Sequence, residues 1–387
     1  MSAAGRSSIS FTVFPIVRLH RLLLLAALCA PGPLAAQPAP SLPRDADPRD
    51  WESYFDLGNR LFERNPRQAA AAFEWAARLD PTRAEPLLGR WAAYFAADQG
   101  SWRAYLDEDP EILRRPGIVR NDSLYARAML RNPFVHRGLE VALYAMLGRE
   151  LRWDGATVAF MEYGRGRFDR AATSFARAAG GNPGRNAHLL FYRALSLVGA
   201  GDLDGAAREV ERLLSVLRDR DERRVGFAYQ SKASLEHALG RLHEERGRPG
   251  LAREAYERAL LEDLAYHPAR QALGRLALAA GDPAAAVEHL AAAAEAAPLD
   301  GVVRFEHGNA LYAAGRLQEA AAEYLAAVER EPFYADIHLR LGLAYENLGE
   351  PARALTAYRA YLERAPRKQE ATAARVRERV AALAAGR

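Results

Sequence analysis

This chain of 387 residues contains very few cysteines and lysines, and its net charge is small. Cys29 is the single cysteine, and Lys232 and Lys368 are the only lysines. The 53 basic and 49 acidic residues nearly cancel, and no basic run is interleaved with aromatic residues. This composition argues against a nucleic-acid-binding surface, because such surfaces concentrate positive charge and stacking side chains.

Catalytic and metal-binding spacings are lacking as well. His237 and His243 lie close together in the sequence, but a zinc pair on a helix needs histidines about four residues apart on one face. Six residues apart the two rings diverge, so we expect both histidines to be exposed helix residues. No Ser-His-Asp or Cys-His set follows from the spacing. The sequence therefore predicts a protein that is not an enzyme and that holds no metal and no cofactor.

An enzymatic alternative would need a polar cluster within residues 101–153 to converge on one cleft. Its candidate members are Trp102, Tyr105, Asp109, Tyr125 and His136. No pairing among these residues demands that interpretation.

The N-terminus has the pattern of a secretory signal peptide. Basic residues precede an apolar run at 22–30, and a stretch of small residues ends at Ala36. This order is typical of a segment removed during export, and the run is too short for a permanent membrane anchor. We predict cleavage after Ala36, which leaves a periplasmic or secreted chain with no cysteine and no transmembrane span. Lipid anchoring at Cys29 is disfavoured, because Leu28 stands where that processing prefers a small residue.

A fixed repeat period is the strongest feature of the sequence. Four series of small or helix-ending residues mark it: Gly240, Gly274, Gly308 and Gly342; Gly247, Gly281, Gly315 and Gly349; Pro298, Pro332 and Pro366; and Ala286, Ala320 and Ala354. The period is about 34 residues, which is typical of a helix–turn–helix repeat. The sequence therefore predicts an all-α array of antiparallel helix pairs.

Residues 301–334 illustrate one repeat. We expect Gly315 to lie in the turn between two helices, where a left-handed residue closes the first helix. Gly308 in the first helix and Ala320 in the second are small, so the two helix axes can approach closely. Tyr324 shares a face with Ala320, four residues earlier, and is predicted to fill the groove that remains.

The residues that recur at this period form a two-helix signature. They are Leu273, Gly274, Gly308, Leu311, Tyr312, Leu341, Gly342 and Tyr345 in the first helices, and Ala286, Leu290, Ala293, Ala320, Tyr324, Ala327, Ala354, Tyr358 and Tyr361 in the second. The signature resembles the tetratricopeptide repeat (TPR) family over about 280 residues. The resemblance implies a right-handed superhelical solenoid of about eight or nine helix pairs. Tyr361 departs from the family pattern, which prefers alanine there.

The chain divides around these repeats. We predict a signal peptide at 1–36, a flexible linker at 37–49, N-terminal TPR-like repeats at 50–100, an irregular helical segment at 101–153, TPR-like repeats at 154–217, C-terminal TPR repeats at 218–366 and a capping helix at 367–387. The irregular segment is either a pair of degenerate repeats, which we favour, or an insertion that contacts a partner.

Two further expectations concern single helices. A charged run at 218–224 should break the register, with a long helix following from Val225 to Glu245. The capping helix should bury one narrow stripe against the last repeat. The predicted stripe is Ala371, Ala374, Val376, Val380 and Leu383.

In the family the first helices line the concave face, so the resemblance implies a partner-binding groove there. The predicted groove residues are Phe305, Asn309, Tyr312, Leu339, Leu343, Glu346, Arg275, Gln271, Arg241, Phe55 and Asn59. An asparagine side chain can both donate to and accept from a peptide backbone, and aromatic rings offer an anchor. Ordinary packing between first helices is the alternative for Phe305 and Tyr312. Phe305 and Phe55 stand where some members place the lysine of a carboxylate clamp, which argues against that mode.

A second candidate is a patch for an anionic partner at 114–137. It comprises Arg114, Arg115, Arg120, Arg127, Arg131 and Arg137. Guanidinium groups suit acidic proteins, phosphate or polysaccharide, but a solvated arginine-rich face is the interpretation we favour.

Together these observations predict an exported scaffold or adaptor that binds a protein or peptide in its concave groove, within a bacterial envelope assembly. The alternative is a glycan-handling accessory protein that uses the aromatic residues of the same groove.

Overall fold

The computed structural model describes residues 38–62, 64–83, 85–97, 155–180, 186–223 and 231–385. The predicted signal peptide, the arginine patch and the alternative enzymatic cluster lie outside the described residues. The described elements are α2 (Trp51–Leu61), α3 (Pro66–Leu79), α4 (Glu85–Ala97), α10 (Gly155–Gly164), α11 (Phe168–Ala179), α12 (Ala187–Ala200), α13 (Leu203–Arg223), α14 (Ala233–Glu245), α15 (Pro249–Glu262), α16 (His267–Ala279), α17 (Pro283–Ala296), α18 (Gly301–Ala313), α19 (Leu317–Arg330), α20 (Ala335–Asn347), α21 (Pro351–Arg364), the 3-10 turn η2 (Arg367–Gln369) and α22 (Glu370–Ala384). No helix within these ranges combines the length and apolar composition that a bilayer crossing requires.

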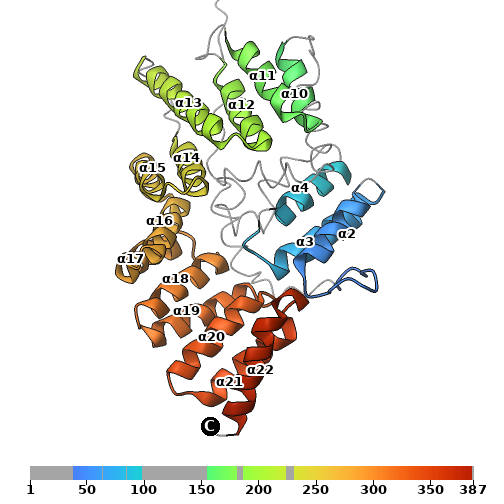
Figure 1. The fold of residues 1–387 in the computed structure, drawn as a ribbon, viewed down its shortest axis with the longest axis vertical. Helices are drawn as coiled ribbons and strands as arrows, with labels where there is room; N and C mark the ends of the chain where they lie inside the picture. The colour runs from blue at the N-terminus through green and yellow to red at the C-terminus, as the bar shows by residue number, and fades with distance from the viewer. Residues whose placement is uncertain are drawn as a thin grey trace, which may run out of the picture. The chain divides into compact units, whose positions relative to one another are not determined.

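Consecutive helices pack in pairs (Figure 1). The pairs are α2 with α3, α10 with α11, α12 with α13, α14 with α15, α16 with α17, α18 with α19 and α20 with α21. Each second helix from α11 to α19 also packs on the first helix of the next pair. The predicted all-α solenoid is therefore confirmed, and its apolar core runs from pair to pair instead of gathering at one centre.

Glycine closes the first helix in six of these pairs. The glycines with positive φ are Gly166, Gly201, Gly247, Gly281, Gly315 and Gly349, with φ between 66° and 84°, and the last four form the periodic series whose member Gly315 was predicted to lie in such a turn. At Gly315, where φ is 74°, the next amide, Arg316 N–H, donates to Leu311 O at 2.9 Å. A side chain with a Cβ would be strained in this left-handed conformation.

A glycine-on-ring contact joins the two helices of a repeat. A Cβ added at Gly308 would lie 2.6 Å from the Tyr324 ring, so the tyrosine packs directly against the backbone of α18. Tyr324 and Ala320 are both fully buried. The predicted close approach of the two helices is confirmed, and it leaves no room for a larger residue at either small position.

The structure corrects the expected helix boundaries around residues 218–245. The charged run stays helical, because α13 extends to Arg223. The expected start at Val225 was wrong, since α14 begins at Ala233 and Ser231 is not helical. The Ser231 hydroxyl accepts a hydrogen bond from the Ala233 amide at 3.2 Å, and a Glu262 carboxylate oxygen accepts from the Lys232 amide at 3.2 Å. These side chains use backbone donors that a longer helix would have kept for itself.

The terminal helix α22 covers the last repeat, but its buried stripe differs from the predicted one. Val376 is buried, and Val380 and Leu383 pack against the same core. Ala373 is the buried alanine, whereas Ala371 and Ala374 are exposed. An alanine-rich helix gives a weak periodic signal, so its rotation was misjudged at the first turn.

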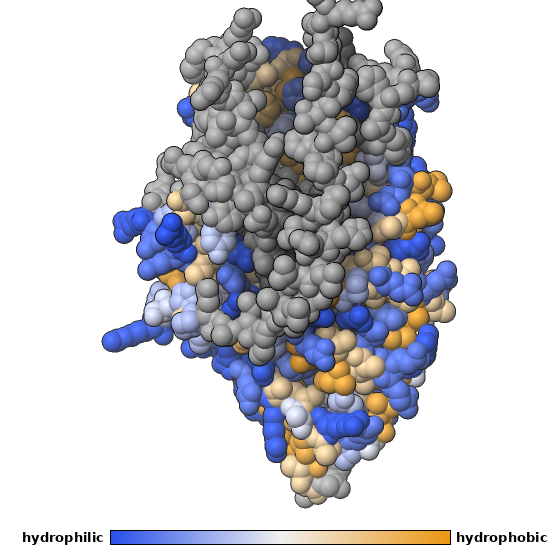
Figure 2. Space-filling model, turned by 180° about the vertical axis from the view of Figure 1, so that it is seen from behind, coloured by the Kyte–Doolittle hydropathy of each residue, from blue (hydrophilic) through white to orange (hydrophobic). Residues whose placement is uncertain are grey.

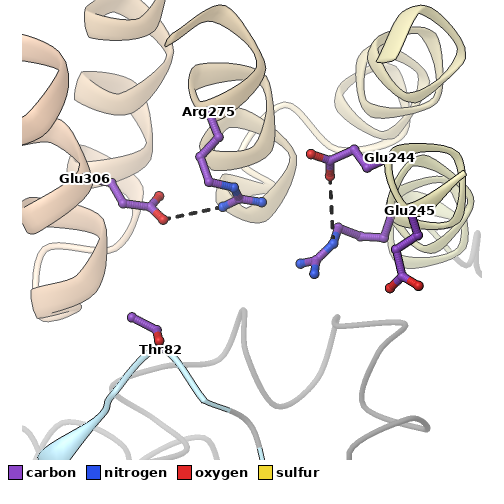
Figure 3. Close-up of a pocket in the computed structure, with 6 residues that line it drawn as sticks. Thr82, Glu244, Glu245, Arg275 and Glu306 are labelled. Atoms are coloured by element: carbon purple, nitrogen blue, oxygen red, sulfur yellow. Dashed lines mark ion pairs between the residues drawn. The ribbon is translucent and has the colours of Figure 1, made fainter. Parts of the chain in front are cut away.

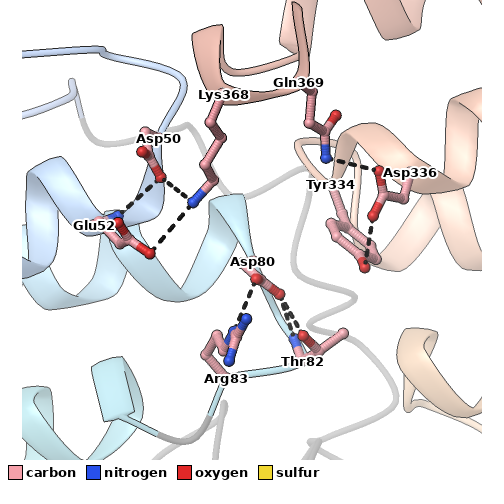
Figure 4. A network of polar contacts seen from close by, with 9 residues as sticks. All are labelled: Asp50, Glu52, Asp80, Thr82, Arg83, Tyr334, Asp336, Lys368 and Gln369. Carbon is pink, nitrogen blue, oxygen red and sulfur yellow. Dashed lines mark hydrogen bonds and ion pairs between the residues drawn. The ribbon is translucent and has the colours of Figure 1, made fainter. Parts of the chain in front are cut away.

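The first repeat contacts the C-terminal end of the chain (Figure 4). Asp47, within the range predicted as a flexible linker, is buried, and its Oδ2 accepts from the Arg367 amide at 2.6 Å. The Lys368 ammonium donates to Asp50 Oδ1 at 2.8 Å and lies 3.4 Å from Glu52 Oε1. Residues 320 positions apart in the sequence are therefore in direct contact.

Candidate partner-binding groove

The first helices of three successive repeats present charged side chains to one pocket (Figure 3). The pocket has a volume of about 400 Å³ and is lined by Thr82, Arg241, Glu244, Glu245, Arg275 and Glu306. The charged residues come from α14, α16 and α18, and Thr82 comes from the loop after α3. Arg241 and Arg275 stand one repeat period apart, whereas no two of the three glutamates occupy equivalent positions of the repeats.

Charges of opposite sign alternate along this pocket. Arg275 Nη1 lies 3.6 Å from Glu306 Oε1, and Arg241 Nε lies 3.8 Å from Glu244 Oε2. Both separations exceed normal hydrogen-bond lengths, so neither ion pair is closed into a tight bidentate geometry. Burial raises the pKa of Glu306, although the charge of Arg275 and a hydrogen bond from Gln271 oppose the shift.

Buried tyrosines of the second helices fix several polar groups of the first helices. The Tyr256 hydroxyl donates to Glu244 Oε2, and the Tyr324 hydroxyl donates to Asn309 Oδ1 at 2.9 Å. Burial raises the pKa of both phenols well above the usual value for tyrosine, so they stay protonated and act as donors. The polar side chains of the groove are thus positioned from the core of each repeat.

Three of the predicted groove residues meet in or beside the pocket. Arg241 and Arg275 line it, and Gln271 hydrogen-bonds to the lining residue Glu306. Arg241 and Arg275 are separated by one repeat period and occupy equivalent positions of α14 and α16. Their role in binding a partner stays a prediction.

The predicted aromatic residues of α18 are packed more deeply. Phe305 is buried, 9% exposed, and its ring lies 5.9 Å from that of Tyr324 and 5.6 Å from that of Tyr334. Tyr312 is half-buried, and its hydroxyl accepts a hydrogen bond from Asn347 Nδ2 at 2.5 Å. Both residues therefore contribute to contacts within the array, as the packing alternative had it.

The remaining predicted residues are partly buried in other repeats. Leu339 and Leu343 pack against the C-terminal core, and Glu346 Oε2 accepts from the Tyr358 hydroxyl at 2.6 Å. In the first repeat, Phe55 lies 5.7 Å from the Trp51 ring, and Asn59 is half-buried in the same helix, α2. None of these five lines the charged pocket.

The expectation that His237 and His243 are exposed was wrong. Both are buried, 3% and 6% exposed, and the His237 ring lies 5.4 Å from that of Tyr256 and 5.8 Å from that of Tyr266. Burial lowers the pKa of His243, which favours a neutral ring in the core. Both rings therefore lie in the interior of the array, His237 beside two tyrosine rings and His243 with its Nδ1 3.5 Å from Arg246 Nη1.

A comparison of sequences assigns the repeats to a family. The tetratricopeptide repeat profile matches residues 162–219, 237–301 and 305–368. These three segments carry tetratricopeptide repeats. The prediction of such repeats from the period of the sequence is therefore confirmed, and the matched ranges cover all or most of each helix from α11 to α21.

Solved structures of tetratricopeptide repeat proteins are similar to part of the chain. One is YrrB, described as a TPR protein with an unusual peptide-binding site, with 22% identity and a TM-score of 0.42 over 50% of this chain and 93% of that one. Another is MamA, with 21% identity and a TM-score of 0.39 over 46% of this chain and 96% of that one. A search of curated proteins finds no match.

Sequence reasoning missed Thr82, Glu244, Glu245 and Glu306 as pocket residues. The three glutamates each stand within about one helical turn of a predicted residue, so a small difference in helix rotation separates the two sets. Thr82 had no signal of its own, because its place in the pocket depends on contacts between distant repeats. On the face of the molecule seen in Figure 2, behind that of Figure 1, hydrophobic residues form separate patches among hydrophilic ones. Such a mixture is normal for a protein surface.

Proposed function

We propose that this protein is an exported tetratricopeptide repeat scaffold that binds a protein or peptide partner in the charged pocket of α14, α16 and α18. The observation that carries the proposal is the convergence of Arg241, Arg275 and Glu306 from three equivalent helices on one pocket. An array of stacked repeats offers an extended surface and needs little rearrangement to hold a ligand.

The chemistry of the pocket favours a partner with charges of both signs. Arginines and glutamates alternate along it, with ion-pair separations of 3.6 and 3.8 Å. Charge complementarity of this kind selects a partner and orients it more than it adds affinity. A peptide segment meets this requirement because its side chains alternate along an extended backbone.

Export and an envelope assembly complete the proposal. They rest on the N-terminal sequence pattern, with cleavage after Ala36. The glycan alternative has less support, because Phe305, one of the aromatic residues expected to form its platform, is buried under neighbouring rings.

The test is an affinity capture from an envelope extract, read by mass spectrometry. The wild type is compared with Arg241→Glu/Arg275→Glu. This double variant reverses the charge of both pocket arginines and leaves the buried residues Phe305 and Tyr324 unchanged. Arg316→Glu is the matched control, because Arg316 is an exposed arginine outside the pocket that pairs with Glu319. We expect a protein retained by the wild type and by the control and lost from the double variant. Equal capture by all three would overturn the assignment of the pocket.

A further inference from the structure

A second interface, which we call the latch, joins the first repeat to the C-terminal repeats. It consists of Asp47, Asp50, Trp51 and Trp75 on the first-repeat side and Phe333, Arg367 and Lys368 on the other. Beside the hydrogen bonds of Asp47 and Asp50, the Trp75 and Phe333 rings meet edge to face with centroids 5.3 Å apart. The latch therefore combines charge-assisted hydrogen bonds with one aromatic contact.

A set of contacts leads from the latch through Trp51 to the pocket, and Figure 4 shows its two ends, Lys368 with Asp50 and Arg83 with Asp80. The Lys368 ammonium lies 5.8 Å from the centroid of the Trp51 ring, and the Arg83 guanidinium lies 5.4 Å from the same ring. Arg83 Nε donates to Asp80 Oδ2 at 3.2 Å. Asp80 Oδ1 in turn accepts from the Thr82 amide at 3.1 Å and from its hydroxyl.

Thr82 is the point at which this set of contacts reaches the pocket. It lines the pocket opposite the charged residues of α14, α16 and α18 (Figure 3). The pocket thus has one wall from the stacked repeats and another from the first repeat. The second wall is the one that the latch residues contact.

We propose that the first repeat is a detachable wall of the charged pocket, held in place by the latch, so that Lys368 and Asp50 control access to a pocket they do not touch. The consequence for a partner rests on the proposed function, but the movement of the wall does not. A partner that contacts both walls favours the closed latch, and by reciprocity the closed latch strengthens its binding.

The composition of the latch makes it separable from the stack. The Lys368 and Glu52 side chains are 45% and 59% exposed, so salt screens their attraction. The stacked repeats are joined by fully buried residues such as Ala320 and Tyr324, which ionic strength leaves largely unaffected. Charge reversal at Lys368 places a carboxylate beside Asp50 and Glu52 and leaves the stack intact.

The first experiment measures the latch without any partner. In the full chain with Cys29→Ser, spin labels at Arg67→Cys in α3 and Arg359→Cys in α21 report the distance between the first repeat and the last. We expect one narrow distance distribution for wild-type Lys368 and for the charge-preserving Lys368→Arg. Lys368→Glu should give a broad distribution with longer distances, and so should 1 M salt. An unchanged narrow distribution for Lys368→Glu would overturn the proposal.

The second experiment measures the pocket itself. Glu306→Cys in the same background is labelled with an uncharged maleimide, and Leu299→Cys, on an exposed loop residue outside the pocket, is the control. We expect Lys368→Glu to raise the labelling rate at position 306 about tenfold, within the usual range of coupling between sites, and to leave position 299 unchanged. Equal rates at position 306 would overturn the link between latch and pocket. Neither result depends on whether the pocket binds the captured partner.

Discussion

The stacked repeats and the latch hold one chain together by different physical means. Within the stack, tyrosines and alanines such as Tyr324 and Ala320 are fully buried and leave no space beside Gly308. In the latch, Lys368 keeps 45% of its side chain exposed while it pairs with Asp50. Burial of apolar surface gives far more stabilisation than exposed ion pairs do. The stack is therefore the permanent part of the molecule, and the latch is the part that conditions can open.

We expect the largest loss of stability from removing the buried Tyr324 ring from the stack. Tyr324→Ala removes a fully buried side chain and should lower the free energy of unfolding by about 3–5 kcal/mol. Hydrogen exchange should locate the loss in α18, α19 and α20, because a repeat contacts only its neighbours.

Tyr324→Phe is the control for this change. It keeps the ring and removes only the hydrogen bond to Asn309, so it should cost about 1 kcal/mol. Equal unfolding midpoints for Tyr324→Ala and the wild type would mean that the ring does not hold the repeat together.

A smaller effect is expected from overfilling the same contact. Ala320→Leu adds bulk where a fully buried alanine faces the neighbouring helix, and should cost about 1–3 kcal/mol. Ala313→Leu, at an exposed position of α18, should change stability by less than about 0.5 kcal/mol. Chemical denaturation of the two variants measures the difference, and a stable Ala320→Leu protein would show that the helices are not in close contact there.

The sequence was sufficient for the stack because its rules are local and repeated. The repeat period indicates which glycines take positive φ and which small residues face the rings. One more series of polar residues recurs at the same period: Arg270, Arg304 and His338. Each side chain hydrogen-bonds to the backbone carbonyl six residues before it. The sequence could not predict these bonds, because they depend on where the loops between repeats place their carbonyl groups.

The pocket was harder to predict because it depends on exact helix rotation. Each residue turns the helix by about 100°, so Phe305 points into the core while its neighbour Glu306 lines the pocket. The period places both on α18 but does not decide between them.

The latch could not be predicted from the sequence for a different reason. Asp47 and Arg367 are 320 residues apart and share no repeat position. Nothing in the local pattern of either residue signals the other. Only the summed geometry of the intervening repeats brings them together.

The smallest effect that we expect is a pH dependence of the latch, which the stack should lack. Burial of Asp47 raises its pKa, but hydrogen bonds from the Arg367 and Arg49 amides and nearby guanidinium charges outweigh this, and the pKa is lowered overall. A lowered pKa contributes stability above the value of the unfolded chain, about 3.9, and that contribution is lost as pH falls through the folded value. The pKa of Lys368 is raised in the folded chain, so its contribution is lost only above about pH 10.5.

Asp47→Asn removes the charge; its amide oxygen can still accept from the Arg367 amide, but its amino group cannot replace Oδ1 as the acceptor for the Arg49 amide. Between about pH 5 and 9 we expect the wild type to keep its latch closed more firmly than the variant by about 1 kcal/mol or less. Spin-label distances recorded across the pH range should show this difference shrinking as pH falls from about 4 through the lowered pKa of Asp47, because Asp47 is then protonated and neutral like the variant. Tyrosine and alanine contacts of the stack carry no such charge. A difference that stayed constant down to low pH would therefore show that Asp47 acts through packing, as the stack does, and would remove the distinction between the two interfaces.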